Sequence, residues 1–228
     1  MIGIICAMKL EAGAIQKEMQ ITGSESISGM EFVRGRLCGQ EIVLAVCGIG
    51  KVFAAVCAEA MILHYAPACI LNSGVAGTLT TKLSIGDIAI ADRLVQHDMD
   101  TTPLGDPPGM ISGLDTIYFE ADPRICRMLA AAADETGAKS CRGTIASGDQ
   151  FLSDPEKKAW IRSAFGAVAC EMEGAAVAQA AYINKVPFGV LRAISDSADG
   201  KAQMEYPKFA AMATARSYAI LRAFLLKF

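Results

Sequence analysis

Residues 167–194 read AVACEMEGAAVAQAAYINKVPFGVLRAI, and this stretch decides the fold class. Its two ends, residues 167–170 and 188–194, are short apolar runs of the kind found in strands buried within a sheet. Between them, residues 173–184 are long enough for a helix of about three turns. Strands that alternate with helices in this way indicate an α/β domain with a largely parallel central sheet.

The same alternation runs along the rest of the chain. Further strands are predicted at residues 2–7, 31–37, 40–47, 68–72, 86–92 and 142–147, with a hairpin turn at Cys38 and Gly39. Further helices are predicted from about Leu10 and at residues 51–65, 122–136, 155–165 and 206–225. Residues 99–117 are rich in Pro, Gly, Asp and Thr and are predicted to be irregular. We find no internal repeat or long linker, so we expect one domain over residues 1–228.

The composition narrows the class of protein. Of the 228 residues, 53% are hydrophobic and 20% are charged, which excludes a disordered chain because such chains lack apolar surface to bury. The net charge of −3 gives no electrostatic basis for nucleic-acid binding. No apolar run approaches the roughly 20 residues that cross a bilayer, and the apolar start lacks a basic flank. We expect a cytoplasmic protein that binds a small molecule, and neither nucleic acid nor a membrane.

The eight cysteines form no Cys-x-x-Cys pair. Most of them lie in apolar segments, as Cys6 and Cys69 do, so we predict buried, reduced thiols that pack as small hydrophobic side chains. His64 and His97 are the only histidines. A zinc site is therefore poorly supported, and no metal site is predicted.

Carboxylates follow several of the predicted strands. Glu11 comes after the first strand, Glu171 and Glu173 follow the strand at 167–170, and Asp196 follows the strand at 188–194. Ligands of α/β sheets bind beyond the carboxyl ends of the strands, so these acids are candidates for one site. Acids that share a site can differ in pKa and supply an acid and a base for glycosidic cleavage. They can equally be favourable charges at a helix start, a turn cap or a solvated helix residue.

Arg192 lies inside an apolar strand, where a charge is rarely buried without a partner. Glu173 is the partner we predict, and the alternative is an edge position with the guanidinium in water.

Three glycine-rich segments are predicted to form turns after strands; they are Gly48-Ile-Gly50-Lys51, Gly74-Val-Ala-Gly77 and Ser147-Gly-Asp149. None has the spacing of a phosphate-binding loop. Their glycines fit a close approach to a ligand or an ordinary tight turn.

Six motifs, in this order and spacing, resemble the bacterial 5'-methylthioadenosine/S-adenosylhomocysteine nucleosidase family over the whole chain. They are Ile2-Gly-Ile-Ile-Cys-Ala-Met-Lys-Leu-Glu11, Gly48-Ile-Gly-Lys51, Asn72-Ser-Gly-Val-Ala-Gly77, Ser147-Gly-Asp-Gln-Phe151, Glu171-Met-Glu173 and Arg192-Ala-Ile-Ser-Asp196. The last two are the most specific. The resemblance implies a nucleoside phosphorylase-like three-layer α/β sandwich with a mixed, largely parallel sheet. It also implies a homodimer, and neither a metal nor an organic cofactor.

The resemblance implies roles by position. Glu11 is expected to activate the attacking water, Asp196 to act as the general acid toward the five-membered ring of adenine, and Glu173 to bind ribose hydroxyls. Adenine leaves poorly unless it is protonated, so Asp196 must hold a proton near neutral pH. The sugar becomes positively charged as adenine departs, and a nearby carboxylate stabilises that charge. The resemblance also implies supporting roles. The backbone of Met172 is expected to help bind the ribose, Arg192 and Glu171 to support the acidic cluster, and Ser195 to orient Asp196. Phe151 is expected to stack on adenine, and the backbone of Leu152 to contact the Watson–Crick edge of adenine.

The apolar 5' group of the substrate needs an apolar slot. Met8, Ile49 and Tyr206 match positions that line this slot in the family, and Leu104 matches a position that the other subunit contributes. The chain departs from the family pattern in three places. Val75 stands where several members have serine, and Leu104 and Tyr206 stand where phenylalanine is frequent. These departures bear on the preference for the 5' substituent and leave the acids unchanged.

Two other functions remain open. A purine nucleoside phosphorylase would share the fold, but similar phosphorylases place an arginine and a serine where this chain has Asn72 and Val75. Glu11 would also repel a phosphate dianion. A non-catalytic nucleoside-binding protein is the second alternative, and loss of one acid would be its expected mark. Glu11, Glu173 and Asp196 are all present, which favours the hydrolase.

Overall fold

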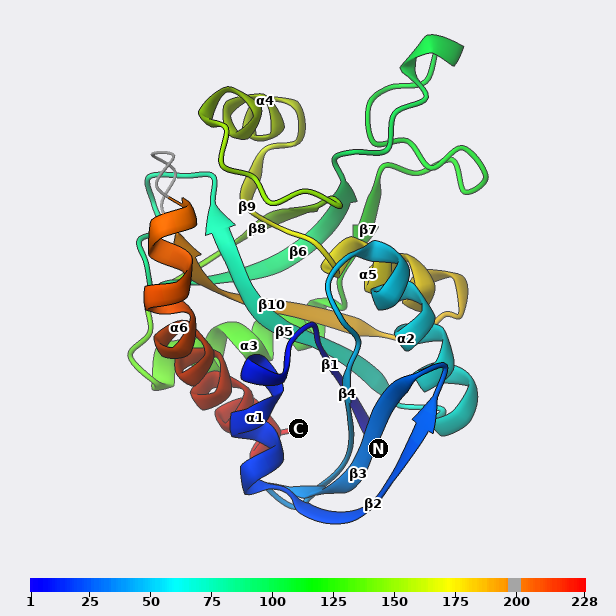
Figure 1. The fold of residues 1–228 in the computed structure, drawn as a ribbon, viewed down its shortest axis with the longest axis vertical. Helices are drawn as coiled ribbons and strands as arrows, with labels where there is room; N and C mark the ends of the chain where they lie inside the picture. The colour runs from blue at the N-terminus through cyan, green and yellow to red at the C-terminus, as the bar shows by residue number, and fades with distance from the viewer. Residues whose placement is uncertain (197–201) are drawn as a thin grey trace.

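The computed structural model describes residues 1–196 and 202–228, while the side chains of residues 202–208 lie outside this description. Its strands form one ten-stranded sheet in the order β10-β6-β8-β9-β5-β1-β4-β3-β2, with β7 paired to β6 (Figure 1). The strands are β1 (Ile2–Cys6), β2 (Gln20–Ile27), β3 (Met30–Leu37), β4 (Gln40–Val46), β5 (Cys69–Thr78), β6 (Ile88–Gln96), β7 (Tyr118–Glu120), β8 (Ser140–Ser147), β9 (Ala167–Glu171) and β10 (Phe188–Asp196).

The sheet is mixed, and part of it closes on itself. The parallel pairs are β1 with β4 and β5, β5 with β10, β6 with β8, and β8 with β9. The pairs β2–β3, β3–β4, β5–β9, β6–β7 and β6–β10 are antiparallel. Because β10 pairs with both β5 and β6, the strands β5, β10, β6, β8 and β9 form a closed ring. The ring brings the ends of distant strands together.

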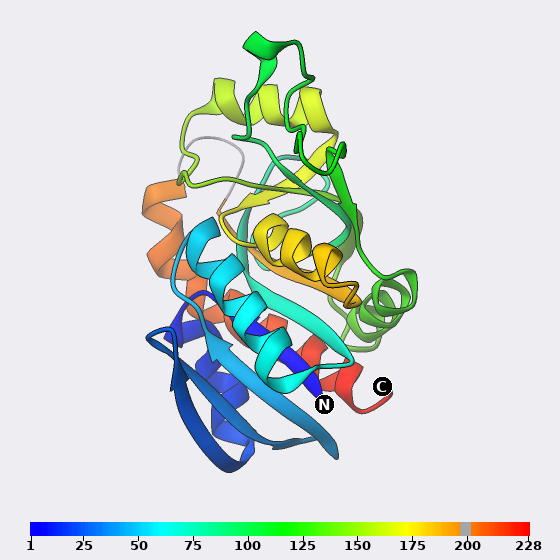
Figure 2. The same ribbon diagram turned by 90° about the vertical axis from the view of Figure 1, so that its right-hand side faces the viewer.

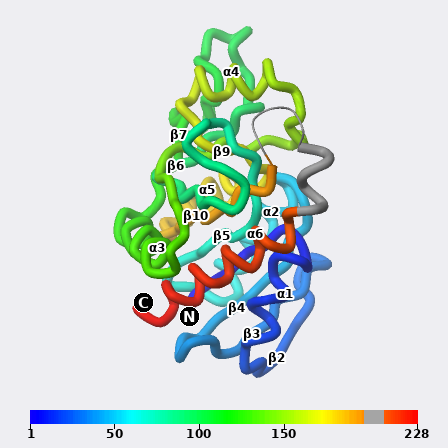
Figure 3. The backbone as a smooth tube through the Cα atoms, turned by 90° about the vertical axis from the view of Figure 1, so that its left-hand side faces the viewer, coloured from blue at the N-terminus to red at the C-terminus, as the bar shows by residue number. Residues whose placement is uncertain are grey.

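Helices cover both faces of the sheet and produce three layers. On one face lie α2 (Lys51–Tyr65) and α5 (Gly174–Ile183), side by side in Figure 2. On the other lie α1 (Lys9–Glu18), α3 (Pro123–Glu135) and α6 (Ala202–Leu225), seen in Figure 3. Neighbouring strand residues alternate between the two cores: Ile88 and Ile90 pack toward α3 and α6, and Ala89 and Ala91 toward α2 and α5. The predicted α/β class is confirmed.

A smaller third cluster holds α4 (Pro155–Phe165) against the end of the sheet. Ile161 and Phe165 of this helix pack with Leu152 and with buried residues of β6, β8 and β9. The irregular residues 99–117 contain a short 3-10 turn, Thr102–Leu104, and project away from the body of the protein beside α4 (Figures 1 and 2). The long irregular loop was predicted correctly.

Several boundaries differ from the sequence prediction. β2 and β7 were not predicted, and β6 continues four residues beyond Asp92, to Gln96. The prediction that Gly74-Val-Ala-Gly77 forms a turn is wrong, because β5 runs through this segment to Thr78. The hairpin turn at Cys38 and Gly39 is present, and both residues have positive φ, as a two-residue turn of this kind requires.

All eight cysteines are unpaired, and six of them are buried. Burial raises the pKa of the Cys47 thiol above its usual range and that of Cys57 to about 12. These thiols are therefore neutral and pack as hydrophobic side chains, as predicted. None of the helices in the described residues is long and apolar enough to span a bilayer.

Candidate active site

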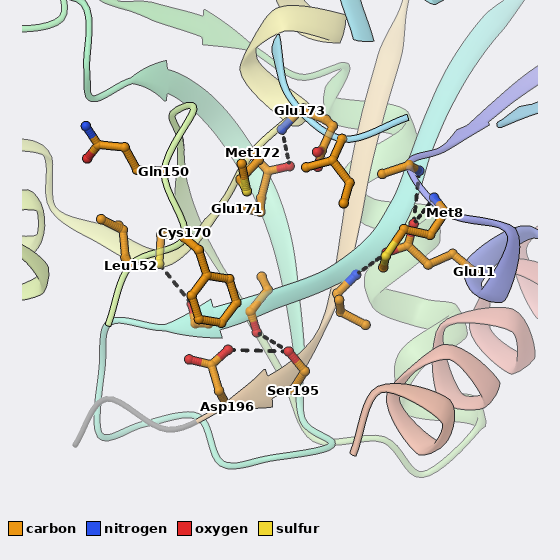
Figure 4. A pocket seen from close by; sticks show the side chains of 16 residues that line it. Met8, Glu11, Gln150, Leu152, Cys170, Glu171, Met172, Glu173, Ser195 and Asp196 are labelled. Atoms are coloured by element: carbon orange, nitrogen blue, oxygen red, sulfur yellow. Dashed lines mark hydrogen bonds between the residues drawn. The ribbon is translucent and has the colours of Figure 1, made fainter. Parts of the chain in front are cut away.

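One pocket collects most of the predicted site residues at the carboxyl ends of β1, β5, β9 and β10. Figure 4 shows Met8 and Glu11 at one end of this pocket, Ser195 and Asp196 at the other, and residues 171–173 on a third side. The predicted residues that line it are Met8, Glu11, Ile49, Val75, Phe151, Leu152, Glu171, Met172, Glu173, Ser195 and Asp196. Residues from six separate segments of the chain therefore converge, as the strand-end argument predicted.

Glu11 is buried at the start of α1 and is held by backbone N–H groups. Its Oε2 accepts from the amides of Ala7 and Met8 at 2.9 and 3.0 Å, and its Oε1 accepts from Val75 at 3.1 Å. Burial raises the pKa of Glu11, although Arg192 and these amides act in the opposite direction. A fixed carboxylate with an elevated proton affinity is suited to take a proton from water.

Arg192 is fully buried in β10, and its main partner is Glu171. The Arg192 Nε lies 3.1 Å from Glu171 Oε2, and the Nη2 donates to the same oxygen and to Asn72 Oδ1. Glu173 lies farther away, with 4.0 Å between its Oε2 and the Arg192 Nη2. The prediction that Glu173 is the main partner of Arg192 is therefore wrong, because Glu171 takes that place. The alternative of an edge position with the guanidinium in water is excluded, because Arg192 is buried.

Glu171 has a second set of contacts that explains this preference. It accepts from the backbone N–H groups of Glu173 and Gly174 at the start of α5, at 3.1 and 2.7 Å, and from the Ser147 hydroxyl. Burial alone would raise the pKa of Glu171, but Arg192, Ser147 and the helix N-terminus hold it below its usual range. Although Glu171 lines the pocket, these contacts engage both of its oxygens, so it supports the site from within the protein.

Glu173 turns toward the pocket. Its Oε1 accepts from the backbone N–H of Gly50 at 2.8 Å, which links it to the loop before α2. Burial and the neighbouring Glu171 charge raise the pKa of Glu173 to about 7, against the opposing effect of Arg192. The carboxyl group is thus close to half-protonated at neutral pH, and it is available to a ligand that donates hydrogen bonds.

The raised pKa of Glu173 predicts a pH-dependent stability. The folded state holds this proton more tightly than the unfolded chain, so its stabilising effect is complete below pH 4.5 and is lost as the pH rises to about 7. We expect Glu173→Gln to be more stable than the wild type at pH 8, by roughly 2–3 kcal/mol, and to be similar near pH 4.5. Urea unfolding at the two pH values measures this difference, with the exposed Glu31→Gln as control. Equal stabilities at pH 8 would contradict the raised pKa.

Asp196 is buried at the end of β10, beside Gly77 of β5. The Ser195 hydroxyl lies 3.4 Å from Asp196 Oδ1, and the Lys158 ammonium lies 3.3 Å from Oδ2. A register shift in the β5–β10 pairing separates Ile194 from Asp196. This irregularity ends the regular strand at the residue that carries the carboxyl group, as bulges next to functional sites often do.

The two glycines of the β5 segment make space for the two acids. A methyl group at Gly74 would lie 2.6 Å from Glu11 Oε1, and one at Gly77 would lie 2.8 Å from Asp196 Oδ2. Both distances are far shorter than a carbon–oxygen contact allows. The glycines predicted to form a turn therefore serve a close approach of carboxylates within a strand.

Comparison with known proteins places this geometry in a family. The model of the phosphorylase superfamily matches residues 1–226. A 5'-methylthioadenosine/S-adenosylhomocysteine nucleosidase from Shewanella loihica is 37% identical over 209 residues, 91% of each chain. The Neisseria meningitidis nucleosidase in complex with methylthio-immucillin-A superposes with a TM-score of 0.95 at 34% identity, over 100% of this chain and 99% of that one. A Helicobacter pylori futalosine hydrolase gives a TM-score of 0.95 at 35% identity, over 100% and 97%.

The chain belongs to the 5'-methylthioadenosine/S-adenosylhomocysteine nucleosidase family. The predicted resemblance is therefore confirmed, together with the predicted class of enzyme and the nucleoside phosphorylase-like fold.

Two of the predicted site residues lie apart from the pocket lining, and a third falls outside the described side chains. Arg192 lies behind Glu171, consistent with support of the acids. Leu104 is 84% exposed on the projecting loop and does not reach the pocket of its own chain. Tyr206 falls where the side chains lie outside the described residues.

The sequence prediction missed four residues of the nucleosidase site. Gly50 donates to Glu173, Ser147 and Asn72 hold the Glu171–Arg192 pair, and Lys158 faces Asp196. Gly50, Ser147 and Asn72 lie in the motifs quoted above, but their partners depend on the tertiary fold. Lys158 has a local signal, because it occupies a helix position three residues before Ile161 and seven before Phe165, on the buried stripe.

Proposed function

We propose that this protein hydrolyses the N-glycosidic bond of 5'-methylthioadenosine and S-adenosylhomocysteine and releases adenine and the 5'-substituted ribose. The observation that carries the proposal is the convergence of Glu11, Glu173 and Asp196 in one pocket, each held by specific contacts. A general acid at one end of the pocket and a general base at the other match the needs of this hydrolysis. The acid protonates the leaving adenine, and the base takes a proton from the attacking water.

The leaving group is assigned to the Asp196 end of the pocket. Adenine lies between Phe151 and this carboxyl group, and Leu152 offers its backbone to the edge of the base. Protonation by Asp196 lets adenine depart as a neutral molecule, and such proton transfer contributes about 10²- to 10⁴-fold to a rate. The sugar then carries positive charge.

The sugar is assigned to the opposite end. Glu173 accepts hydrogen bonds from the ribose hydroxyls, and the backbone of Met172 contributes beside it. Glu11 takes a proton from the attacking water and stabilises the positive sugar electrostatically. The apolar side chains of Met8, Ile49 and Val75 line the same pocket and suit a thioether at the 5' position.

Hydrolysis is favoured over phosphorolysis by the charge of the pocket. None of the described residues that line it is a lysine, an arginine or a histidine, whereas four of them carry carboxyl groups: Glu11, Glu171, Glu173 and Asp196. Arg192 is engaged by Glu171 and Asn72 behind the lining. A phosphate dianion would lack a cationic ligand in this part of the chain and would meet carboxylates instead.

Product analysis tests the proposed reaction. The purified protein is incubated with 5'-methylthioadenosine, with and without phosphate, and the sugar product is identified. We expect free methylthioribose and adenine under both conditions. Methylthioribose 1-phosphate that forms only with phosphate would establish a phosphorylase. Absence of any released purine base in every case, including incubations with S-adenosylhomocysteine and futalosine, would favour a nucleoside-binding protein. Futalosine is included because a hydrolase of that compound has a similar structure.

Gly77→Ala is expected to lower kcat/KM for 5'-methylthioadenosine by roughly 10- to 100-fold, because the added methyl group displaces the Asp196 carboxyl group. The measurement is initial rates of adenine release, with circular dichroism to confirm folding. Gly13→Ala is the matched control, since no atom lies within 4 Å of a methyl group at that exposed position. Wild-type kinetics in a folded Gly77→Ala protein would contradict the assigned position of the acid.

We also propose that the protein is a homodimer through the α2–α5 face, which we define as Val52, Phe53, Val56, Leu63, Tyr182 and Ile183. All six side chains are exposed and apolar, and they come from two helices that pack side by side (Figure 2). A cluster of exposed apolar side chains on one face is typical of an interface. Leu104, exposed on the projecting loop, would then reach the pocket of the partner subunit.

Val52→Glu is expected to shift the dimer toward monomer, because it places a charge within the apolar face that forms the proposed interface. The measurement is sedimentation velocity at micromolar concentration. Leu10→Glu is the control, since Leu10 is exposed on α1 at the opposite face of the sheet. A monomeric wild type, or a Val52→Glu protein that stays dimeric, would contradict this interface.

The unpaired thiols agree with a reducing compartment, so we propose a cytoplasmic location. We further propose that residues 1–228 act as one domain, since the sheet includes strands from β1 to β10.

A further inference from the structure

The helix α4 carries a lysine on its buried stripe. Its buried residues are Lys158, Ile161 and Phe165, and the latter two pack into the cluster that contains Leu152 and Cys170. Lys158 is only 3% exposed. Lysine is rarely buried without a partner, because its ammonium loses hydration, so a specific contact must compensate for the position.

Asp196 provides that contact. The Lys158 Nζ lies 3.3 Å from Asp196 Oδ2, while the Ser195 hydroxyl lies 3.4 Å from Oδ1. Two ionisable groups on neighbouring elements interact with Asp196, namely Lys158 from α4 and the Cys170 thiol from β9. Burial raises the pKa of Cys170 to about 12, so that thiol is neutral. Of these two groups only Lys158 is charged, so the charge that faces Asp196 from them is positive.

We propose that Lys158 is a positioning residue for the reaction, whose ammonium orients the Asp196 carboxyl group and favours its ionised form. The inference rests on the proposed function, in which Asp196 protonates adenine. Lys158 is outside the pocket lining, so it acts through Asp196 rather than on the nucleoside.

The ion pair has a chemical consequence that a purely structural contact would lack. A cation within hydrogen-bond distance of a carboxyl group makes its proton easier to lose. The protonated, active form of Asp196 is then confined to lower pH, and Lys158 sets the pH at which activity declines on the alkaline side. In return, the carboxyl group is held between Lys158 and Ser195 in one orientation toward the pocket.

The test compares pH profiles of kcat/KM for 5'-methylthioadenosine in the wild type, Lys158→Met and Lys158→Arg. Methionine fits the apolar surroundings of the stripe without charge, and arginine keeps the charge. We expect the alkaline decline to move upward by about one to three pH units in Lys158→Met and to stay near the wild-type value in Lys158→Arg. Arg162→Met removes an exposed cation from the same helix and is expected to leave the profile unchanged. A folded Lys158→Met protein with the wild-type profile would overturn the proposal.

A second measurement needs no turnover and no Lys158 variant. Carbon-13 NMR of carboxyl-labelled aspartate follows the titration of Asp196 in the wild type, with its resonance assigned by its loss in Asp196→Asn. In contrast to the sequence expectation of a protonated group near neutral pH, we expect an ionised Asp196 at pH 7 in the free protein, so that only its minor protonated fraction reacts. A protonated Asp196 at pH 7 would overturn the proposal. Because this titration is independent of substrate, it separates a failure of the ion pair from a failure of the proposed hydrolysis. It also keeps the test decisive if Lys158→Met does not fold.

Discussion

Asp196→Asn should lower the turnover of 5'-methylthioadenosine by about 10²- to 10⁴-fold while nucleoside affinity changes little. An asparagine has nearly the same shape as aspartate. Its carbonyl oxygen can accept from Lys158 and its NH2 group can donate to the Ser195 hydroxyl oxygen, but it has no carboxyl proton to give. Adenine would then depart without protonation. The rate should therefore fall in kcat rather than in KM, since the lost interaction belongs to the transition state.

Single-turnover kinetics and calorimetric titration of the nucleoside measure the two quantities separately. The control is Asp92→Asn, which neutralises an aspartate paired with Arg142 on the surface and outside the pocket lining. We expect wild-type turnover in that variant. Unchanged kcat in Asp196→Asn would remove Asp196 as the general acid, and loss of binding with normal kcat would make it a recognition group only.

Local signals were enough to predict the helices. Asp122 caps α3 by accepting from the amides of Arg124 and Ile125, and Asp154 caps α4 by accepting from Glu156. Each of these aspartates precedes a proline at the first helical position, a pattern that is complete within four residues. Such caps depend only on neighbours along the chain, so the sequence contains all the information needed to place them.

The strands were predicted less well where their residues are not buried in the usual pattern. β2 is exposed along most of its length and pairs only with β3, so it shows no alternation of polar and apolar residues. β5 continues through Gly74 and Gly77 because carboxylates from other segments occupy the space that side chains would fill. Neither feature can be recognised from a local hydrophobic pattern.

The sequence predicted which acids lie at the site but not which of them pairs with Arg192. The strand-end rule placed Glu11, Glu171, Glu173 and Asp196 at one pocket before any geometry was available. It could not distinguish Glu171 from Glu173 as the partner of Arg192, because the two residues differ by two positions in the chain. The start of α5 decides the matter: Glu171 accepts from its first amides, and Glu173 turns to Gly50.

Arg192→Met should destabilise the protein by about 3–5 kcal/mol, because it leaves buried carboxylates without their cation. Arg192 interacts with Glu171, Glu173 and Glu11, and it is fully buried. The effect depends on pH with a definite sign. In the wild type Glu171 has a lowered pKa, so its stabilising effect is present above the unfolded value and is lost as the pH falls. Without Arg192, burial raises the pKa instead, so the variant loses stability as the pH rises.

The difference in unfolding free energy between wild type and Arg192→Met should therefore be larger at pH 8 than at pH 5, as measured by urea denaturation. Arg142→Met is the control, since its pair with Asp92 is about 40% exposed and should contribute less than about 1 kcal/mol at either pH. The double variant Arg192→Met/Glu171→Gln should recover part of the loss, because it removes the unpaired charge along with its partner. No recovery would mean that Arg192 stabilises the fold through packing and Asn72, and that the ion pair with Glu171 contributes little.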